Sequence, residues 1–219
     1  MSPTEATTDA ATNRQVAAPL GRRERNKLKV KERLYSSAIA LFAEQGYDET
    51  SIDEIVERAD VARGTFFNYF QRKEDLLGAW GEKRRDALMA TLAADGGEAD
   101  SAIGQLRHCM TILSRMSEGH QQETNSLLMA WVRAGRPLLE EPYLAELFAG
   151  IAAEGIRAGE FSTRFTAEQI GFALRDLYLG ALYRWCGRPE AAADQLAHEL
   201  MTTLDLMLEG VQAARDPRD

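Results

Sequence analysis

The stretch RGTFFNYF, Arg63–Phe70, places four aromatic rings within five residues. Such a cluster is compatible with a buried strand, an aromatic ligand site or a helix packed against a core. A strand is disfavoured because Gly64 lies inside the segment, helical patterns flank it closely, and no neighbouring run offers a pairing partner. Successive side chains of a helix are 100° apart, so Phe66 and Phe70 share one face, which we expect to be buried. The stretch is therefore predicted to be a short helix.

The remaining side chains of this helix point elsewhere. Thr65 and Tyr69 share a second face, and Gly64 and Asn68 share a third face directed away from the core. Phe67 lies on the border between core and surface. Core packing explains two of the four rings, and the others need a different reason to be exposed.

The preceding segment, TSIDEIVERAD (residues 50–60), predicts a second short helix. Ser51 is followed three residues later by Glu54, which is the pattern of a capping box. The break before Arg63 is very short, and its Asp60 is a residue that tolerates the left-handed conformation of a tight turn. Two short helices joined in this way describe a helix-turn-helix, whose second helix enters the DNA major groove.

Helical spacing continues along the rest of the chain. Leu34, Ala38, Leu41 and Phe42 keep one face of a helix that Gly46 closes, and Thr166 with Gln169 forms another capping box. The later helices are predicted at roughly 101–117, 121–135, 139–158, 167–186 and 190–213, with Pro189 in the first turn of the last one. We predict an all-α protein with a small N-terminal unit and a larger C-terminal one.

The charge of the chain is unevenly distributed. The 219 residues are 45% hydrophobic, enough for one large domain or two small ones, and the formal net charge is −8. Between Arg22 and Arg33, however, seven positive residues stand against two negative ones. This segment is a candidate anion-binding arm, with a solvated helix surface as the alternative.

Several classes of protein find no support in the sequence. The three histidines form no HExxH, and no GxGxxG, P-loop or GxSxG occurs, so we expect no enzymatic activity, cofactor or metal site. A helical enzyme with scattered acid and base groups remains an alternative. Cys109 and Cys186 form no CxxC pair, which favours a reduced cytoplasmic protein with the thiols packed in the core rather than sensing redox state. No apolar run is long enough to span a membrane, and residues 1–21 suggest a disordered tail without a signal peptide.

The order of the N-terminal motifs carries a family resemblance. LFAEQGY is followed by the capping box, then by RGTFFNYF and then by KEDLL. This order resembles the DNA-binding domain of the TetR family of bacterial transcriptional regulators, over residues 27–87 with the helix-turn-helix at 50–69. Two turn positions depart from the family pattern: Asp60 stands where Gly is common, and Ala62 stands where Ser or Thr would cap the helix.

The resemblance implies a set of DNA contacts. Arg63 is the candidate for a guanine contact, with a phosphate contact as the alternative, and Asn68 faces the groove, where it is able to read adenine. Gly64 lets the backbone approach DNA, and Phe67 packs on a thymine methyl or a sugar where the family often has Tyr. The implied phosphate ligands are Thr50, Ser51, Thr65, Tyr69 and Lys73, the last at the start of the fourth helix.

The resemblance also implies what the C-terminal unit, residues 88–215, does. It would bind a small-molecule effector that releases a repressor from a roughly palindromic operator, and it would form a homodimer through about 167–213. Apolar residues beyond the needs of one face, such as Leu177, Leu182, Leu200 and Leu204, agree with pairing of the last two helices. The candidate effector-lining residues, each also compatible with simple core packing, are Met110, Met129, Trp131, Tyr143, Arg175 and Tyr178. Arg175 beside Asp176 is either a polar anchor or an exposed pair. A regulator controlled by a protein partner is the alternative.

Overall fold

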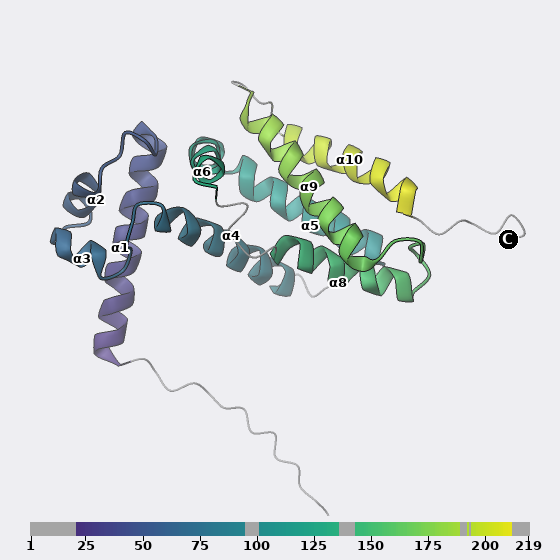
Figure 1. Cartoon of the computed structure of the whole chain (residues 1–219), viewed down its shortest axis with the longest axis horizontal. Helices are drawn as coiled ribbons and strands as arrows, with labels where there is room; N and C mark the ends of the chain where they lie inside the picture. The colour runs from purple at the N-terminus through teal and green to yellow at the C-terminus, as the bar shows by residue number, and fades with distance from the viewer. Residues whose placement is uncertain (1–20, 95–100, 136–142, 189–191, 193, 212–219) are drawn as a thin grey trace, which may run out of the picture.

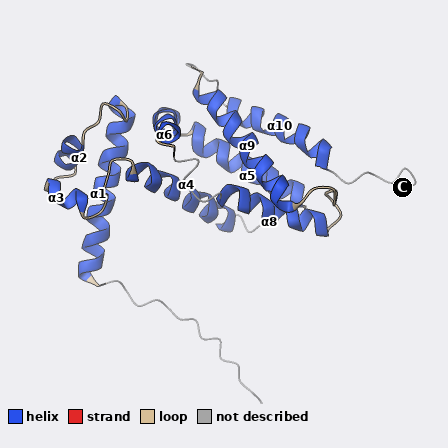
Figure 2. Cartoon of the chain, viewed as in Figure 1, coloured by secondary structure: helices blue, strands red, loops and turns tan. Residues whose placement is uncertain are grey.

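The computed structural model of the protein describes residues 21–94, 101–135, 143–188, 192 and 194–211. All regular elements in these ranges are helices, as Figure 2 shows. In chain order they are α1 (Arg22–Gln45), α2 (Ile52–Arg58), α3 (Arg63–Phe67), α4 (Asp75–Ala94), α5 (Ala102–Glu118), α6 (Gln121–Arg133), α8 (Tyr143–Arg157), α9 (Ala167–Cys186) and α10 (Gln195–Val211). The all-α prediction is confirmed for the described residues.

The helices form two groups joined by α4. In Figure 1, α1, α2 and α3 lie together at one end, α5, α8, α9 and α10 form the other end, and α4 runs between them. Within α4, Trp80 and Leu88 are both buried, at 5% and 0% exposure. Because α4 is unbroken from Asp75 to Ala94, one continuous helix crosses the boundary expected at residues 87 and 88.

Local signals account for several helix ends. The Ser51 hydroxyl accepts a hydrogen bond from the Glu54 amide (3.2 Å), and the Thr166 hydroxyl accepts one from the Gln169 amide (3.2 Å), so both capping boxes are confirmed. Asp60 has a φ of 50°, as the tight turn requires, and Ala62 caps α3 without a side-chain hydrogen bond. Gly46, with a φ of 91°, ends α1.

Other boundaries differ from the sequence prediction. Helix α1 begins at Arg22, before residue 27 where the DNA-binding domain was expected to start, so the charged arm is helical. The last helix begins at Gln195, not near residue 190, since Asp194 has a φ of 60°, which interrupts a right-handed helix just before it. Pro189, the predicted tail and the expected start of the helix at 139 lie outside the described residues.

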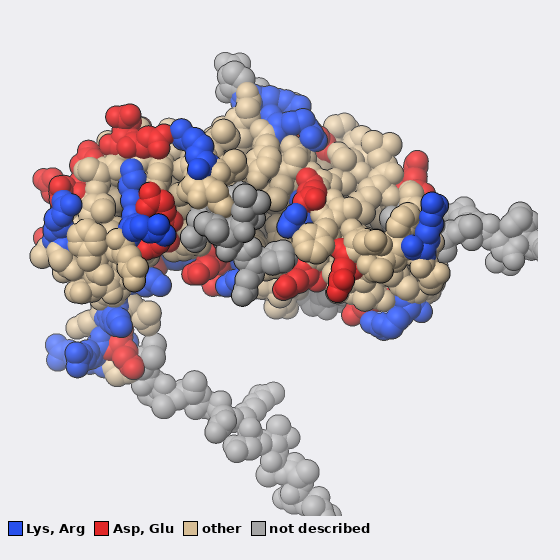
Figure 3. All heavy atoms as spheres, in the orientation of Figure 1, with Lys and Arg blue, Asp and Glu red and all other residues tan. Residues whose placement is uncertain are grey.

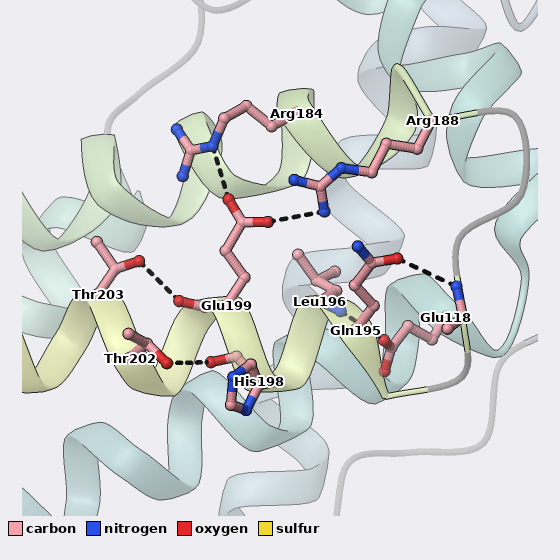
Figure 4. Close-up of polar contacts among 10 residues, drawn as sticks. Glu118, Arg184, Arg188, Gln195, Leu196, His198, Glu199, Thr202 and Thr203 are labelled. Carbon is pink, nitrogen blue, oxygen red and sulfur yellow. Dashed lines mark hydrogen bonds and ion pairs between the residues drawn. The ribbon is translucent and has the colours of Figure 1, made fainter.

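The C-terminal helices pack closely on one another. At Gly171 of α9, a Cβ atom would lie 2.3 Å from the Ala145 carbonyl oxygen of α8, so the close approach of these helices requires glycine. Between α9 and α10, the Glu199 carboxylate accepts hydrogen bonds from Arg184 (2.6 Å) and Arg188 (3.1 Å), as Figure 4 shows. Glu118 at the end of α5 accepts the Leu196 amide (2.8 Å) and fixes the start of α10.

Candidate nucleic-acid interface

The helix-turn-helix is held together by its aromatic side chains. Phe66 and Phe70 are buried at 0% and 4% exposure, and their ring centroids are 5.7 Å apart. Phe67 is 47% exposed, with its ring edge-on to Phe66 at 5.5 Å. Arg63 and Asn68 are exposed, while Tyr69 is half-buried. The division of this stretch into a buried face and an outer face is therefore as predicted, and Phe67 belongs to the outer face.

Gly64 has no structural reason to be glycine. A Cβ atom at this position would meet nothing within 4 Å, and the φ angle of Gly64 lies outside the positive range that favours glycine. The open space in front of it lies on the exposed side of α3. The fold alone would accept a side chain here, so the absence of one favours contact with something outside the protein.

The polar groups around Gly64 are available for such a contact. Within the described part of the chain, the side chains of Thr65, Asn68 and Tyr69 make no hydrogen bond. The Arg63 guanidinium is paired with the Asp53 carboxylate of α2 and lies 5.9 Å from the Phe67 ring centroid. Asp53 was not among the predicted site residues; it lies in the first turn of α2 and reaches Arg63 across the turn at residues 59–62.

The position of Thr50 differs from that expected of a phosphate ligand. Its side chain is 1% exposed, and its hydroxyl donates a hydrogen bond to the Gly46 carbonyl (2.8 Å) and accepts one from Gln45 Nε2 (3.3 Å). This hydroxyl closes the loop between α1 and α2 and does not face solvent. Ser51 is exposed, with its hydroxyl shared between the Glu54 amide and carboxylate.

Lys73 also has a different place from the one expected. It precedes α4, and its ammonium donates to the carbonyls of Tyr47 (2.7 Å), Thr50 (2.8 Å) and Asp48 (3.4 Å). An ammonium has three N–H donors, so these bonds use its full capacity. Its charge also lies 4.3 Å from the Tyr47 ring centroid. Lys73 therefore holds the loop before α2 in place, and its ammonium has no N–H left for a phosphate.

The basic segment from Arg22 to Arg33 also contains both exposed cations and a cation that bonds to its own fold. Residues 22–29 are all exposed, and Figure 3 shows Lys and Arg side chains gathered at the N-terminal end of α1. Arg33, its last cation, instead donates from Nε to the Ala59 carbonyl (3.0 Å) and from Nη2 to the Asp60 carbonyl (2.7 Å). Arg33 thus satisfies carbonyls at the end of α2, and the exposed residues before it remain candidates for long-range attraction to an anion.

Comparisons with known proteins agree with this geometry. The sequence model described as "Bacterial regulatory proteins, tetR family" matches residues 34–80, which contain the helix-turn-helix. The crystal structure of FadR from Thermus thermophilus, a TetR family transcriptional repressor in complex with lauroyl-CoA, is similar over 85% of this chain and 97% of that one, with a TM-score of 0.65 and 30% identity. The chain belongs to the TetR family.

Curated relatives from the same family are also similar. The transcriptional repressor KstR from Rhodococcus jostii is 28% identical over 81% of this chain and 82% of its own length. The transcriptional regulator TcmR from Streptomyces glaucescens is 26% identical over 71% of this chain, and the match spans 65% of TcmR, less than two thirds of that protein. Membership of the TetR family makes this chain a DNA-binding transcriptional regulator.

The predicted effector residues of this TetR protein lie on α5, α6, α8 and α9. Met110 and Tyr178 are buried, Trp131 and Tyr143 are half-buried, and Met129 is 46% exposed. Arg175 pairs with Asp176 (2.6 Å) and lies 4.9 Å from the Phe172 ring centroid. None of these six residues lines the cleft of about 520 Å³ that lies between α4, α5 and the start of α6. Their contact with an effector stays a prediction.

On α9 and α10, the helices expected to pair across a dimer, the exposed apolar residues differ from the leucines that were predicted. Leu182, Leu200 and Leu204 are buried within one chain, at 2%, 0% and 0% exposure, so they are not the surplus that the sequence suggested. Leu177 is half-buried. Among the described side chains of α9 and α10, the large apolar ones that are exposed are instead Phe172 (44%) and Leu206 (66%). No helix in the described ranges is both long and apolar enough to cross a membrane.

Proposed function

We propose that this TetR-family protein is a homodimeric transcriptional repressor that binds an operator through α3 and leaves it when a small-molecule effector binds. The observation that carries the DNA-binding part is the surface around Gly64. There, open space in front of the backbone is combined with polar groups on Thr65, Asn68 and Tyr69 that bond to no described residue through their side chains. A groove of DNA fills such space and supplies partners for these groups.

Each residue on this surface has a distinct proposed role. Arg63 reads guanine with its two-pronged guanidinium, and Asn68 reads a neighbouring base. Thr65 and Tyr69 donate to phosphates, and Ser51 does so in place of its bond to the Glu54 carboxylate, which fixes the register of α3 without selecting a sequence. Phe67, 47% exposed, packs on a thymine methyl or a sugar. The exposed cations of residues 22–31 add the salt-dependent share of the affinity.

Dimerisation is proposed through the outer faces of α9 and α10. A single helix-turn-helix contacts one half-site, so a two-fold symmetric dimer supplies the second. Phe172 and Leu206 provide exposed apolar surface on these helices, and the Arg184–Glu199–Arg188 cluster holds the pair together within each chain. The operator is accordingly proposed to be pseudo-palindromic.

The regulation is proposed to come from a small molecule. The similar structure of Thermus thermophilus FadR contains lauroyl-CoA, and it supports an effector of this general kind. Control by a protein partner is the alternative, and a thermal-shift screen that includes lauroyl-CoA separates the two. A pocket ligand must raise the melting temperature of the folded protein.

Selection of bound genomic fragments tests the DNA-binding proposal. Fluorescence anisotropy on the selected duplex and a scrambled duplex then compares the wild type with Arg63→Ala. We expect a loss of roughly tenfold or more on the selected duplex, with little change on the scrambled one. Arg164→Ala, an exposed arginine before α9, is the matched control. Equal losses on both duplexes would make Arg63 a phosphate contact, and no preference by the wild type for any DNA would refute the proposal.

A further inference from the structure

A cleft of about 520 Å³ lies at the junction of the two helix groups. Its walls come from α4, α5 and the first turn of α6, and Tyr35 of α1 lines its remaining side. This volume is within the range of small-molecule sites, which is roughly 300–1,000 Å³. A ligand here would touch Tyr35 of α1, the helix that precedes the helix-turn-helix, and the C-terminal unit together.

The charged lining of the cleft is mainly positive. It contains Lys83, Arg84 and Arg115 against a single carboxylate, Glu123, in a chain whose net charge is −8. Lys83 is neutralised by Glu32 (2.6 Å), and Arg84 donates to the Ser117 hydroxyl (2.9 Å). The Arg115 guanidinium has no hydrogen bond or ion pair to any residue that the structure describes. Its donors are therefore free to bind an anion.

The inner part of the cleft is apolar. Trp80 and Ile112 are each 5% exposed, and Met116 is half-buried beside them. Burial, and next the Glu123 carboxylate, raises the pKa of the Tyr35 phenol, so its hydroxyl stays protonated and able to donate. An apolar floor below a cationic rim matches a ligand with an apolar body and one anionic end.

We propose that this cleft binds a small organic anion of that kind, such as a medium-chain carboxylate, with Arg115 and Arg84 holding the charged group. The inference rests on the proposed function, because this anion is then the effector that releases the operator.

Hydrogen bonds across the cleft link α4 to α6 and α6 to α1, and they provide a route from the ligand to the DNA-binding domain. The Trp80 indole donates to the Glu123 carboxylate (3.3 Å), which links α4 to α6. Next to Glu123, Gln122 donates to the Ala43 carbonyl (2.9 Å) and Ser126 donates to the Phe42 carbonyl (2.8 Å) in the last turn of α1. A bound anion beside Glu123 repels its carboxylate, weakens the link to Trp80 and shifts the position of α6 on α1.

Calorimetric titration tests the chemistry of the ligand. Decanoate is compared with decanamide, which has the same chain without the charge, on the wild type, Arg115→Ala and Arg157→Ala. Arg157 is an exposed arginine of α8 outside the cleft and serves as the matched control. We expect decanoate to bind, decanamide to bind at least about tenfold more weakly, and Arg115→Ala to weaken decanoate by about tenfold, with Arg157→Ala unchanged. Circular dichroism confirms that each variant is folded.

The outcomes separate this inference from the proposed function. Absence of decanoate binding, equal binding of the amide, or an unaffected Arg115→Ala variant would overturn the cleft proposal. The proposed DNA-binding function is tested separately, by operator binding measured without any ligand. Glu123→Gln is expected to bind decanoate several-fold more tightly, since the repulsion is removed while Trp80 keeps an acceptor. Unchanged or weaker binding would overturn the repulsive step.

Discussion

Arg63 of α3 is ion-paired with Asp53 of α2, across the turn of the helix-turn-helix. The two side chains are 55% and 70% exposed, so the pair contributes at most about 1 kcal/mol to stability. Its consequence is expected at the DNA surface. Asp53 orients the guanidinium, but it also places a negative charge where phosphates would approach.

Asp53→Asn is therefore expected to change DNA binding more than folding. Removing the charge should raise the affinity for a scrambled duplex several-fold and for the operator by less, because operator binding also loses the orientation of Arg63. The ratio of the operator affinity to the scrambled-duplex affinity then falls, while the melting temperature is nearly unchanged. Anisotropy at several salt concentrations measures both affinities. Glu57→Gln, another exposed carboxylate of α2, is the control, and an equal effect there would assign the change to net charge alone.

Lys73 is expected to matter for stability. Its ammonium satisfies three carbonyls of the loop between α1 and α2, so Lys73→Met leaves them without that partner. We expect the free energy of unfolding to fall by about 1–3 kcal/mol, measured by urea denaturation. Lys29→Met removes an exposed lysine of α1 and should have little effect. Equal stability of the two variants would contradict the structural role of Lys73.

Lys73 also marks the limit of what the sequence could predict. The capping boxes at Ser51 and Thr166 and the turn at Asp60 were recoverable, because neighbouring residues along the chain determine them. The partners of Lys73 lie 23–26 residues away, and the Arg33 partners lie 26–27 residues away, so only tertiary packing reveals them. A Lys before a helix has the same local pattern whether it faces a phosphate or carbonyls of its own fold.

The cleft could not be predicted from the sequence for a similar reason. It is built from four helices, and none of the four carries a local motif for an anion. The six effector-lining residues that the family resemblance suggested lie on α5, α6, α8 and α9. For the same reason three of the four leucines expected at the dimer surface, Leu182, Leu200 and Leu204, proved to be core: helical spacing identifies an apolar face but not the element that covers it.

Both cysteines are expected to react slowly in the folded protein. Burial raises the pKa of the Cys109 thiol to about 11 and that of Cys186 to about 11, so few thiolates form at pH 8. Titration with a disulfide reagent at pH 8 should be slow in buffer and fast in urea. Unfolded thiols ionise near pH 9, so the stability that comes from keeping them neutral is present below pH 9 and declines as the pH rises towards 11. Rapid native labelling would contradict this.

Leu206 provides the test of the dimer. It is 66% exposed on α10, on a helix whose buried leucines already complete the core of one chain, so its apolar surface serves no purpose within that chain. Leu206→Glu places a charge in the proposed interface and is expected to give a monomer in light scattering coupled to size-exclusion chromatography. Operator affinity should fall by roughly a hundredfold or more, because the two half-sites are then bound independently. Leu28→Glu, on an exposed leucine of α1 (54%), is the matched control and should stay dimeric. If Leu206→Glu remained a dimer with unchanged operator affinity, the interface would lie away from α10.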